Sequence, residues 1–256
     1  QWPNVDRVAA TAYDTRSPRE DQCETVQDEW NGQQMRTIFV GDLHGCAAEF
    51  ETLLETIGYT GRDRLLLAGD AFSRGPDPLR VWELILATGA EMVLGNHDAR
   101  LLLQLDAHAA GDKPRFKKPD QKACYNALRP VFDMLHPWLQ SVPLKIDEER
   151  FLLVHAGIHP LVGVDGTSRQ QFITIRTWPP TDGIKGPRWH DVIEPFDDRM
   201  IIFGHDAPGG LVVKRHAPEE RPHILGLDSG CIYGGQLTAY LYEEDRLVQV
   251  PSQQDG

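Results

Sequence analysis

The sequence has few cysteines, and their spacing excludes several kinds of site. Its 256 residues contain four cysteines, and no two of them form a C-x-x-C pair. This argues against a zinc ribbon, a thioredoxin-type motif and a disulfide scaffold, and it favours an intracellular, reducing environment. None of the four has an arginine six positions later, which a cysteine-nucleophile phosphate loop would need. Cysteine catalysis is therefore not expected.

Positive charge and long apolar runs are also scarce. The chain has 26 lysines and arginines against 38 aspartates and glutamates, a net charge of −12. Broad nucleic-acid binding needs an extended basic surface, so it is not expected, and a polyanionic substrate would have to be held locally. No apolar run approaches the ~20 residues of a membrane span, so no membrane association is expected. The sequence gives no indication of the oligomeric state.

The chain is expected to consist of a polar arm and one α/β domain. Residues 1–34 are polar and lack periodicity, which is typical of an N-terminal arm. Residues 35–256 are within the size of a single domain, and apolar runs of strand length alternate there with segments of helical periodicity. The sequence begins at Gln1, so any N-terminal targeting segment would be missing from it. The cysteine usage makes the cytoplasm the expected compartment.

Two later segments carry more specific expectations. Residues 123–142 are predicted to be helical with breaks at Pro130 and Pro137. Residues 161–198 lose periodicity and accumulate proline, glycine and tryptophan. Loops of that length are uncommon in compact domains unless they are functional, so this segment is predicted to form the rim of the active site, with Arg176 as a phosphate contact.

Five predicted strands end in the same way, with a run of large apolar residues followed by glycine or histidine and a polar side chain. In a parallel or mixed sheet the carboxyl ends of such strands converge on one crevice. Nitrogen and oxygen ligands without thiolate favour Mn, Fe, Co or Zn, and the size of the set suits two ions with a shared carboxylate. An isolated aspartate of this kind more often caps a helix, and an isolated histidine more often lies in a core, so the prediction depends on the ordered set. Asp70, in its middle, is the expected bridging ligand. The set is Asp42, His44, Asp70, Asn96, His155 and His205.

One basic segment stands out in this acidic chain. Residues 112–122 contain five lysines and arginines against two aspartates. Such a segment is either a flap that attracts phosphate or a solvated, charged loop.

The order of the motifs resembles a known family. The motifs are G-D-x-H-G at 41–45, G-D-x-x-x-R-G at 69–75, G-N-H-D at 95–98, H-A-G at 155–157 and G-H at 204–205. Together they resemble the calcineurin-like metallophosphoesterases of the phosphoprotein-phosphatase type. The stretches 69–76, 203–207 and 227–235 resemble the ApaH-like phosphatase branch, which includes symmetrical diadenosine tetraphosphatases. The resemblance covers about residues 36–250.

The resemblance implies an α/β fold, a four-layer α/β/β/α sandwich with two mixed β-sheets and a dinuclear metal site at the strand ends. One divalent ion would be held by Asp42, His44 and Asp70, and the other by Asp70, Asn96, His155 and His205. His97 would be the general acid that protonates the leaving oxygen. Arg74 and Arg176 would clamp the phosphoryl oxygens.

The sequence departs from the protein phosphatases of this family at Ser73. Those relatives have an aspartate there, which holds the imidazolium of the catalytic histidine, and a hydroxyl cannot supply that charge. His97 therefore needs another acceptor or works with a lower pKa. Asp228 is the carboxylate considered as that substitute partner, although it could equally tie down the Ser229–Gly230 turn.

The resemblance implies hydrolysis of a phosphoanhydride in a polyphosphorylated small molecule. The leading expectation is diadenosine tetraphosphate cut symmetrically to two ADP. The alternatives are a serine/threonine protein phosphatase, or an endopolyphosphatase or messenger-RNA cap hydrolase of the same branch. A catalytically inactive metal-binding module is disfavoured because the full ligand set and His97 are present.

Overall fold

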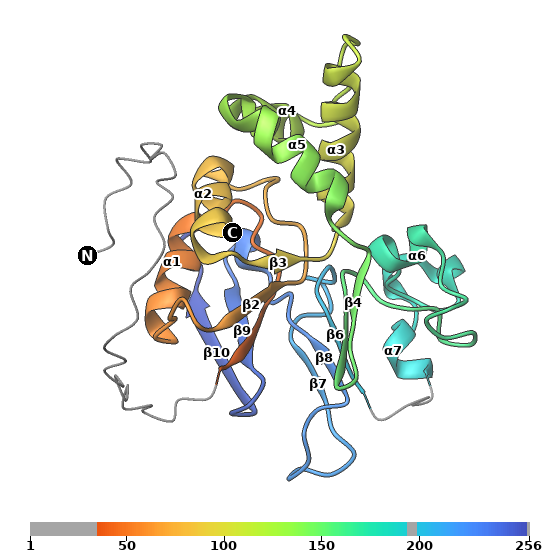
Figure 1. The fold of residues 1–256 in the computed structure, drawn as a ribbon. Helices are drawn as coiled ribbons and strands as arrows, with labels where there is room; N and C mark the ends of the chain where they lie inside the picture. Colours follow the sequence, from red (N-terminus) through yellow and green to blue (C-terminus); the bar gives the residue numbers. More distant parts are fainter. Residues whose placement is uncertain (1–34, 194–198, 255–256) are drawn as a thin grey trace, which may run out of the picture. The chain divides into compact units, whose positions relative to one another are not determined.

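The strands of the described residues, 35–193 and 199–254, form two five-stranded sheets in this computed structural model (Figure 1). The first sheet has the order β10-β9-β1-β2-β3, and the second has the order β4-β5-β6-β8-β7. In the first sheet β1, β2 and β3 are parallel, and β9 and β10, which pair antiparallel, lie on one side of them. In the second sheet the parallel strands β5, β6 and β8 have an antiparallel strand at each edge, so both sheets are mixed. The strands are β1 Thr37–Val40, β2 Arg64–Leu67, β3 Glu91–Met92, β4 Lys145–Asp147, β5 Phe151–Val154, β6 Met200–Phe203, β7 Val212–Lys214, β8 Ile224–Gly226, β9 Gln236–Leu241 and β10 Arg246–Pro251.

The central strands are buried on both faces, which explains their continuous apolar runs. Successive side chains of a strand point to opposite faces. Phe39 of β1 packs between the sheets in a cluster that includes Phe151 of β5. Ile38 and Val40 point the other way and pack in a cluster with helix residues such as Phe50.

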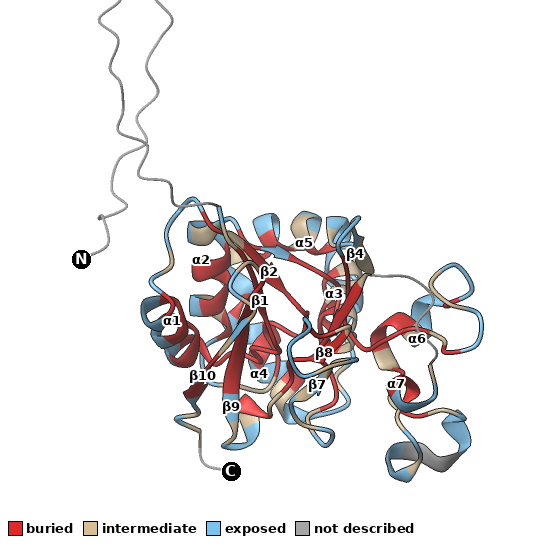
Figure 2. Ribbon diagram, turned by 90° about the horizontal axis from the view of Figure 1, so that it is seen from below, coloured by how far each residue is buried: buried red, intermediate tan, exposed pale blue. Residues whose placement is uncertain are grey.

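The helices cover the outer faces of the two sheets. Figure 2 shows that α1 and α2 turn their buried faces toward the first sheet, and residues of α6 and α7 pack on the outer face of the second. The four-layer α/β/β/α order is therefore confirmed. Helices α3, α4 and α5 lie together beyond the strand ends (Figure 1). The helices are α1 Ala47–Thr56, α2 Pro78–Thr88, α3 Asn96–Ala109, α4 Pro119–Ala127, α5 Phe132–Ser141, α6 Arg169–Thr174 and α7 Trp189–Val192.

Two expectations about helices and loops are corrected. Pro130 lies in a 3₁₀ turn before α5, as a break should, but Pro137 lies inside α5 and does not end it. Both Pro137 and Asp133 are exposed, so the Asp133 carbonyl that Pro137 cannot bond is open to solvent. The segment 161–198 is not wholly irregular, because it contains α6, a 3₁₀ helix at Pro180–Lys185 and α7.

Residues 35–256 form one compact unit. The polar arm predicted for residues 1–34 lies outside the described residues. Among the helices that are described, none has the length and apolar character needed to cross a membrane.

Candidate active site

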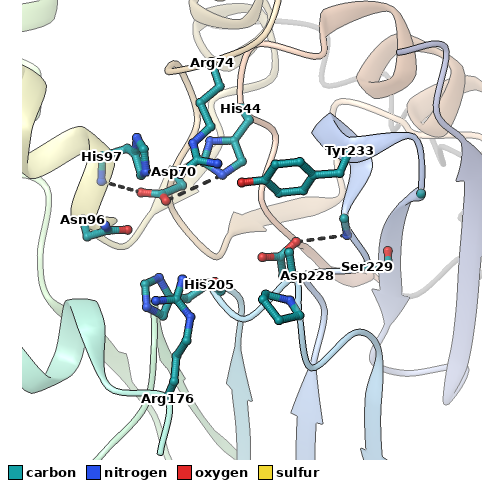
Figure 3. Close-up of a pocket in the computed structure, with 14 residues that line it drawn as sticks. His44, Asp70, Arg74, Asn96, His97, Arg176, His205, Asp228, Ser229 and Tyr233 are labelled. Carbon is teal, nitrogen blue, oxygen red and sulfur yellow. Dashed lines mark hydrogen bonds and ion pairs between the residues drawn. The ribbon is translucent and has the colours of Figure 1, made fainter. Parts of the chain in front are cut away.

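The loops that follow β1, β2 and β3 of one sheet and β5, β6 and β8 of the other meet around a cavity of about 510 Å³ (Figure 3). Eight of the ten residues singled out from the sequence line it. The other two, Asp42 and His155, are buried directly behind it, next to lining residues. The eight are His44, Asp70, Arg74, Asn96, His97, Arg176, His205 and Asp228.

Asp70 lies at the centre of this arrangement. Its Oδ2 is 3.5 Å from His155 Nε2 and 3.8 Å from His44 Nε2. Of the three buried groups of described residues whose ligand atoms lie within 4.8 Å of one another, the group of Cys46, Glu49 and Cys231 lies outside this cavity, and the other two include Asp70. One adds Asp42 and His44, and the other adds His155 and His205. Two cations held by these groups would share the Asp70 carboxylate.

The polar atoms of these groups face one another closely enough to share a cation. The His155 Nδ1–H donates to the Ala68 carbonyl oxygen over 2.7 Å, which directs Nε2 toward Asp70 and Asn96. Burial lowers the pKa of His155, but the charge of Asp70 outweighs this and raises it to about 10, so Nε2 carries a proton that faces Asn96 Oδ1 at 3.3 Å, and a cation would take the place of that proton. His205 Nε2 and Asp42 Oδ2 are buried with no hydrogen-bond partner among the described residues. Buried polar atoms without a partner are rare, and cations held by the two groups would satisfy both of these atoms. The donor set therefore fits divalent metal ions.

The pKa shifts of the carboxylates and of His44 also favour bound cations. Burial, followed by the charge of Asp228, raises the pKa of Asp42 well above its usual range. Burial also raises the pKa of Asp98 to about 7 and that of Asp228 to about 6. Burial lowers the pKa of His44 to about 4, which keeps its imidazole neutral, the form that binds metals. Cations between these carboxylates would offset the unfavourable gathering of negative charge.

The backbone is strained at the ligands themselves. His44, Asp70 and His205 have φ angles of 47°, 51° and 70°, in the left-handed region. Each such residue costs on the order of 1–3 kcal/mol and persists only where its surroundings impose it. The strain turns each of these side chains toward the cavity directly after its strand ends.

Two glycines are required by the close approach of ligand carboxylates. A Cβ at Gly95 would lie 2.1 Å from Asp70 Oδ1, and a Cβ at Gly204 would lie 2.0 Å from Asp42 Oδ1. Each glycine immediately precedes another predicted ligand, Asn96 or His205. The repeated glycine in the motifs thus makes room for a carboxylate from a neighbouring strand.

His97 lies beside Arg74 at the start of α3. The Arg74 Nη2–H donates to His97 Nε2 over 3.0 Å, and the Arg74 guanidinium lies 5.4 Å from the centre of the Tyr233 ring. The His97 backbone N–H donates to Asp70 Oδ1 over 2.8 Å. Burial, and then the charges of Arg74 and Arg100, lower the pKa of His97 to about 4. Its buried Nδ1 has no hydrogen-bond partner among the described residues.

Of the remaining two predicted residues, Arg176 is held by the loop after β6 and Asp228 by its own turn. The Arg176 Nη2–H donates to the His205 carbonyl oxygen over 2.9 Å, and its Nε lies 3.4 Å from Asp206 Oδ1. Of the residues described in 161–198, only Arg176 lines the cavity, so the rim prediction holds for that residue alone. Asp228 Oδ1 accepts the Gly230 N–H over 3.1 Å, and Figure 3 shows it across the cavity from His97. The geometry supports the turn-fixing role of Asp228 and not a pairing with His97.

Comparison with known proteins adds the family. Residues 35–240 match the family described as calcineurin-like phosphoesterase. The chain belongs to this family. It is 28% identical to the symmetrical bis(5'-nucleosyl)-tetraphosphatase of Nitrosomonas europaea over 85% of this chain and 98% of that protein. It is 30% identical to the protein of the same name from Chromohalobacter salexigens, over 80% of this chain and 94% of that one. A crystal structure of a candidate diadenosine tetraphosphatase matches with a TM-score of 0.66 and 31% identity, over 85% of this chain and 94% of that chain.

Asp98 of this phosphoesterase is a site residue that the sequence analysis missed. Its buried carboxylate accepts the backbone N–H groups of Asp70 at 2.6 Å, Ala71 at 3.1 Å and Gly95 at 3.2 Å. It therefore fixes the loop after β2 to the loop after β3. The available signal was its place as the last residue of the Gly-Asn-His-Asp motif, three residues into α3, where a carboxylate bonds free backbone N–H groups.

Proposed function

We propose that this calcineurin-like phosphoesterase hydrolyses a phosphoanhydride bond of a dinucleoside tetraphosphate and releases two nucleoside diphosphates. The two symmetrical bis(5'-nucleosyl)-tetraphosphatases that this chain resembles align with it over 98% and 94% of their own lengths. Family membership implies divalent metal ions, and the two ligand groups that share Asp70 fit them. We further propose Mn, Fe, Co or Zn as the ions, because the ligands are nitrogen and oxygen atoms without thiolate.

The divalent ions, when bound, supply Lewis-acid activation of a water and of the phosphoryl group. In the hydrolysis the oxygen of a water forms a bond to phosphorus, the bond from phosphorus to the bridging oxygen breaks, and the water loses a proton. Arg74 and Arg176 line the cavity and present planar donors to phosphoryl oxygens. A phosphoryl oxygen that takes the Arg74 donor releases the lone pair of His97 Nε2, which can then take up a proton to replace the one that the attacking water gives to solvent, and pass it to the departing oxygen.

The environment of His97 is the observation that most favours a phosphoanhydride over a phosphoprotein as the substrate. Its Nδ1 has no acceptor and its pKa is lowered to about 4, so the imidazolium form is poorly supported. A serine or threonine alkoxide is a poor leaving group that depends strongly on protonation. A departing nucleoside diphosphate is already acidic and depends on it much less. The site therefore suits an anhydride better than a phosphoprotein.

A substrate panel with metal-loaded protein tests this proposal. We expect turnover of diadenosine tetraphosphate with ADP as the nucleotide product, and little release of phosphate from phosphoserine peptides. Inorganic polyphosphate and a messenger-RNA cap analogue complete the panel, because enzymes of the same branch act on them. Release of phosphate from phosphopeptides, with the dinucleoside tetraphosphate left intact, would contradict the proposal.

A further inference from the structure

A second cavity, of about 850 Å³, lies between α3 and the basic segment that follows it. Arg100 of α3 and Lys113, Arg115 and Lys117 of that segment line it, with Asp112 as the only lining carboxylate. No carboxylate of the described residues forms an ion pair with any of the four cations, whereas Arg64 and Arg80 each have two such partners. In a protein of net charge −12, this cavity therefore has a local excess of positive charge.

The basic segment is fixed against the helices and is not a free loop. Gln104 and Gln121 are buried, and both line the cavity. The Gln104 side-chain amide donates to the Arg115 carbonyl oxygen over 3.3 Å. The Gln121 Oε1 accepts the Lys117 N–H over 2.9 Å. These contacts fix the backbone of the segment at Arg115 and Lys117, while Lys113, Arg115 and Lys117 themselves are exposed to solvent.

The second cavity lies along the face of α3 that begins at His97, although the two cavities share no lining residue. His97, Arg100, Gln104 and Ala107 are spaced by three or four residues and so share that face. With a rise of about 1.5 Å per residue, Arg100 lies about 4.5 Å and Ala107 about 15 Å along the helix axis from His97. The charge of Arg100 is close enough to lower the pKa of His97.

We propose that this cavity binds the departing nucleotide half of the substrate, with its phosphates on Arg100, Lys113, Arg115 and Lys117. The proposal rests on the proposed function, because the group that leaves toward His97 must extend beyond it. The cavity also offers an apolar surface to a base. Leu103 is 68% exposed and lines the cavity together with Pro114. Cations beside exposed apolar side chains suit a nucleoside phosphate better than a bare phosphate chain.

A pair of double variants with the same loss of charge tests the cation contacts. Lys113→Ala/Lys117→Ala removes two cavity cations, and Lys118→Ala/Lys122→Ala removes two cations of the same segment that do not line the cavity. Binding of ADP to the metal-loaded full chain, measured by calorimetry, should weaken about fivefold in the first variant and stay within about twofold of wild type in the second. Equal affinities in all three proteins would overturn the proposal.

Kinetics of the same variants provide a second readout. With diadenosine tetraphosphate the cavity variant should show a raised KM and an unchanged kcat, because contacts away from the reacting bond stabilise ground and transition states alike. With bis(4-nitrophenyl) phosphate, which is too short to reach the cavity, its KM should match wild type. An equal rise in KM on both substrates would contradict a role for the cavity.

The base contact and the proposed function are tested separately. Leu103→Ser should weaken the binding of ADP and leave inorganic tripolyphosphate unaffected, and equal behaviour toward both would overturn the nucleoside assignment. If wild type fails to split the dinucleoside tetraphosphate while ADP binding still depends on Lys113 and Lys117, the proposed function fails and the binding site stands. If wild type splits it while both double variants bind ADP equally, the cavity assignment alone fails.

Discussion

Asp70 belongs to both groups of buried metal-type ligands, and its other carboxylate oxygen holds the backbone of His97. One side chain thus connects the two sets of ligands to the proposed general acid. The pattern of strand ends in the sequence was sufficient to single it out. Its contact with the His97 N–H was not predictable, because it depends on how the loops after β2 and β3 approach each other.

Asp70→Asn should remove metal from both positions and abolish turnover, because a neutral amide cannot bridge two divalent ions as a carboxylate does. Mass spectrometry of the purified variant should find well below the metal content of wild type. Asp77→Asn is the matched control, since Asp77 caps α2 and asparagine caps equally well. A metal content in Asp70→Asn equal to that of the control would refute the bridging role.

Ser73 stands where protein-phosphatase relatives have an orienting aspartate. It is buried and forms a hydrogen bond with the Cys124 thiol. His97 Nδ1 has no partner among the described residues, and Asp228 does not replace the missing carboxylate. The departure visible in the sequence therefore agrees with the lack of an acceptor at His97 Nδ1 among the described residues, and the hydrogen bond that Asp228 forms goes to the Gly230 N–H.

Ser73→Ala should lower kcat on a dinucleoside tetraphosphate by less than about tenfold, whereas His97→Ala should lose on the order of 10²–10⁴. Ser73→Asp should raise activity on alkyl phosphomonoesters, because a carboxylate would support the imidazolium. Steady-state kinetics on both substrate classes measure these effects. A loss above about 10² in Ser73→Ala would make Ser73 part of the catalytic machinery.

The turns that follow the strands position the predicted metal ligands, and the glycines in these turns explain why the motifs repeat. At Gly95 a side chain would collide with the Asp70 carboxylate. Each turn therefore combines a backbone that approaches a neighbouring ligand with a ligand of its own. The glycine repeats in the motifs because a side chain at that position would collide with a neighbouring ligand.

Gly95→Ala should weaken metal binding by about 10–100-fold, the range found when groups that orient metal ligands are disturbed. Gly61→Ala is the control, because a Cβ at Gly61 meets nothing within 4 Å. A metal titration monitored by calorimetry measures the metal affinity of both variants. Equal metal affinity in both would show that the Asp70 carboxylate tolerates displacement.

The sequence predicted the buried central strands well but missed both edge strands of the second sheet. Strands β1, β5 and β6 are fully buried and appear as uninterrupted apolar runs. Strands β4 and β7 lie at the edges of the second sheet, are only partly buried and include charged residues, so no apolar run marks them. The short helices in 161–198 were missed for a related reason, since a helix of four to six residues shows too little periodicity.

Across the whole molecule, the site exists only because two sheets face each other. Asp42, Asp70 and Asn96 come from the first sheet, and His155 and His205 come from the second. Motif order could predict that these residues meet. It could not predict Asp98, which acts through backbone N–H groups, or the basic cavity along α3, because both depend on packing between segments.

Product analysis during a metal titration tests the central claim most directly. Protein stripped of metal by a chelator is mixed with diadenosine tetraphosphate, and manganese is added stepwise while the nucleotides are separated by chromatography. We expect no turnover in the stripped protein, and two ADP for each substrate consumed once both ligand groups are filled. Turnover that persists in the chelator, or products that are AMP and ATP, would contradict a metal-dependent symmetrical hydrolase.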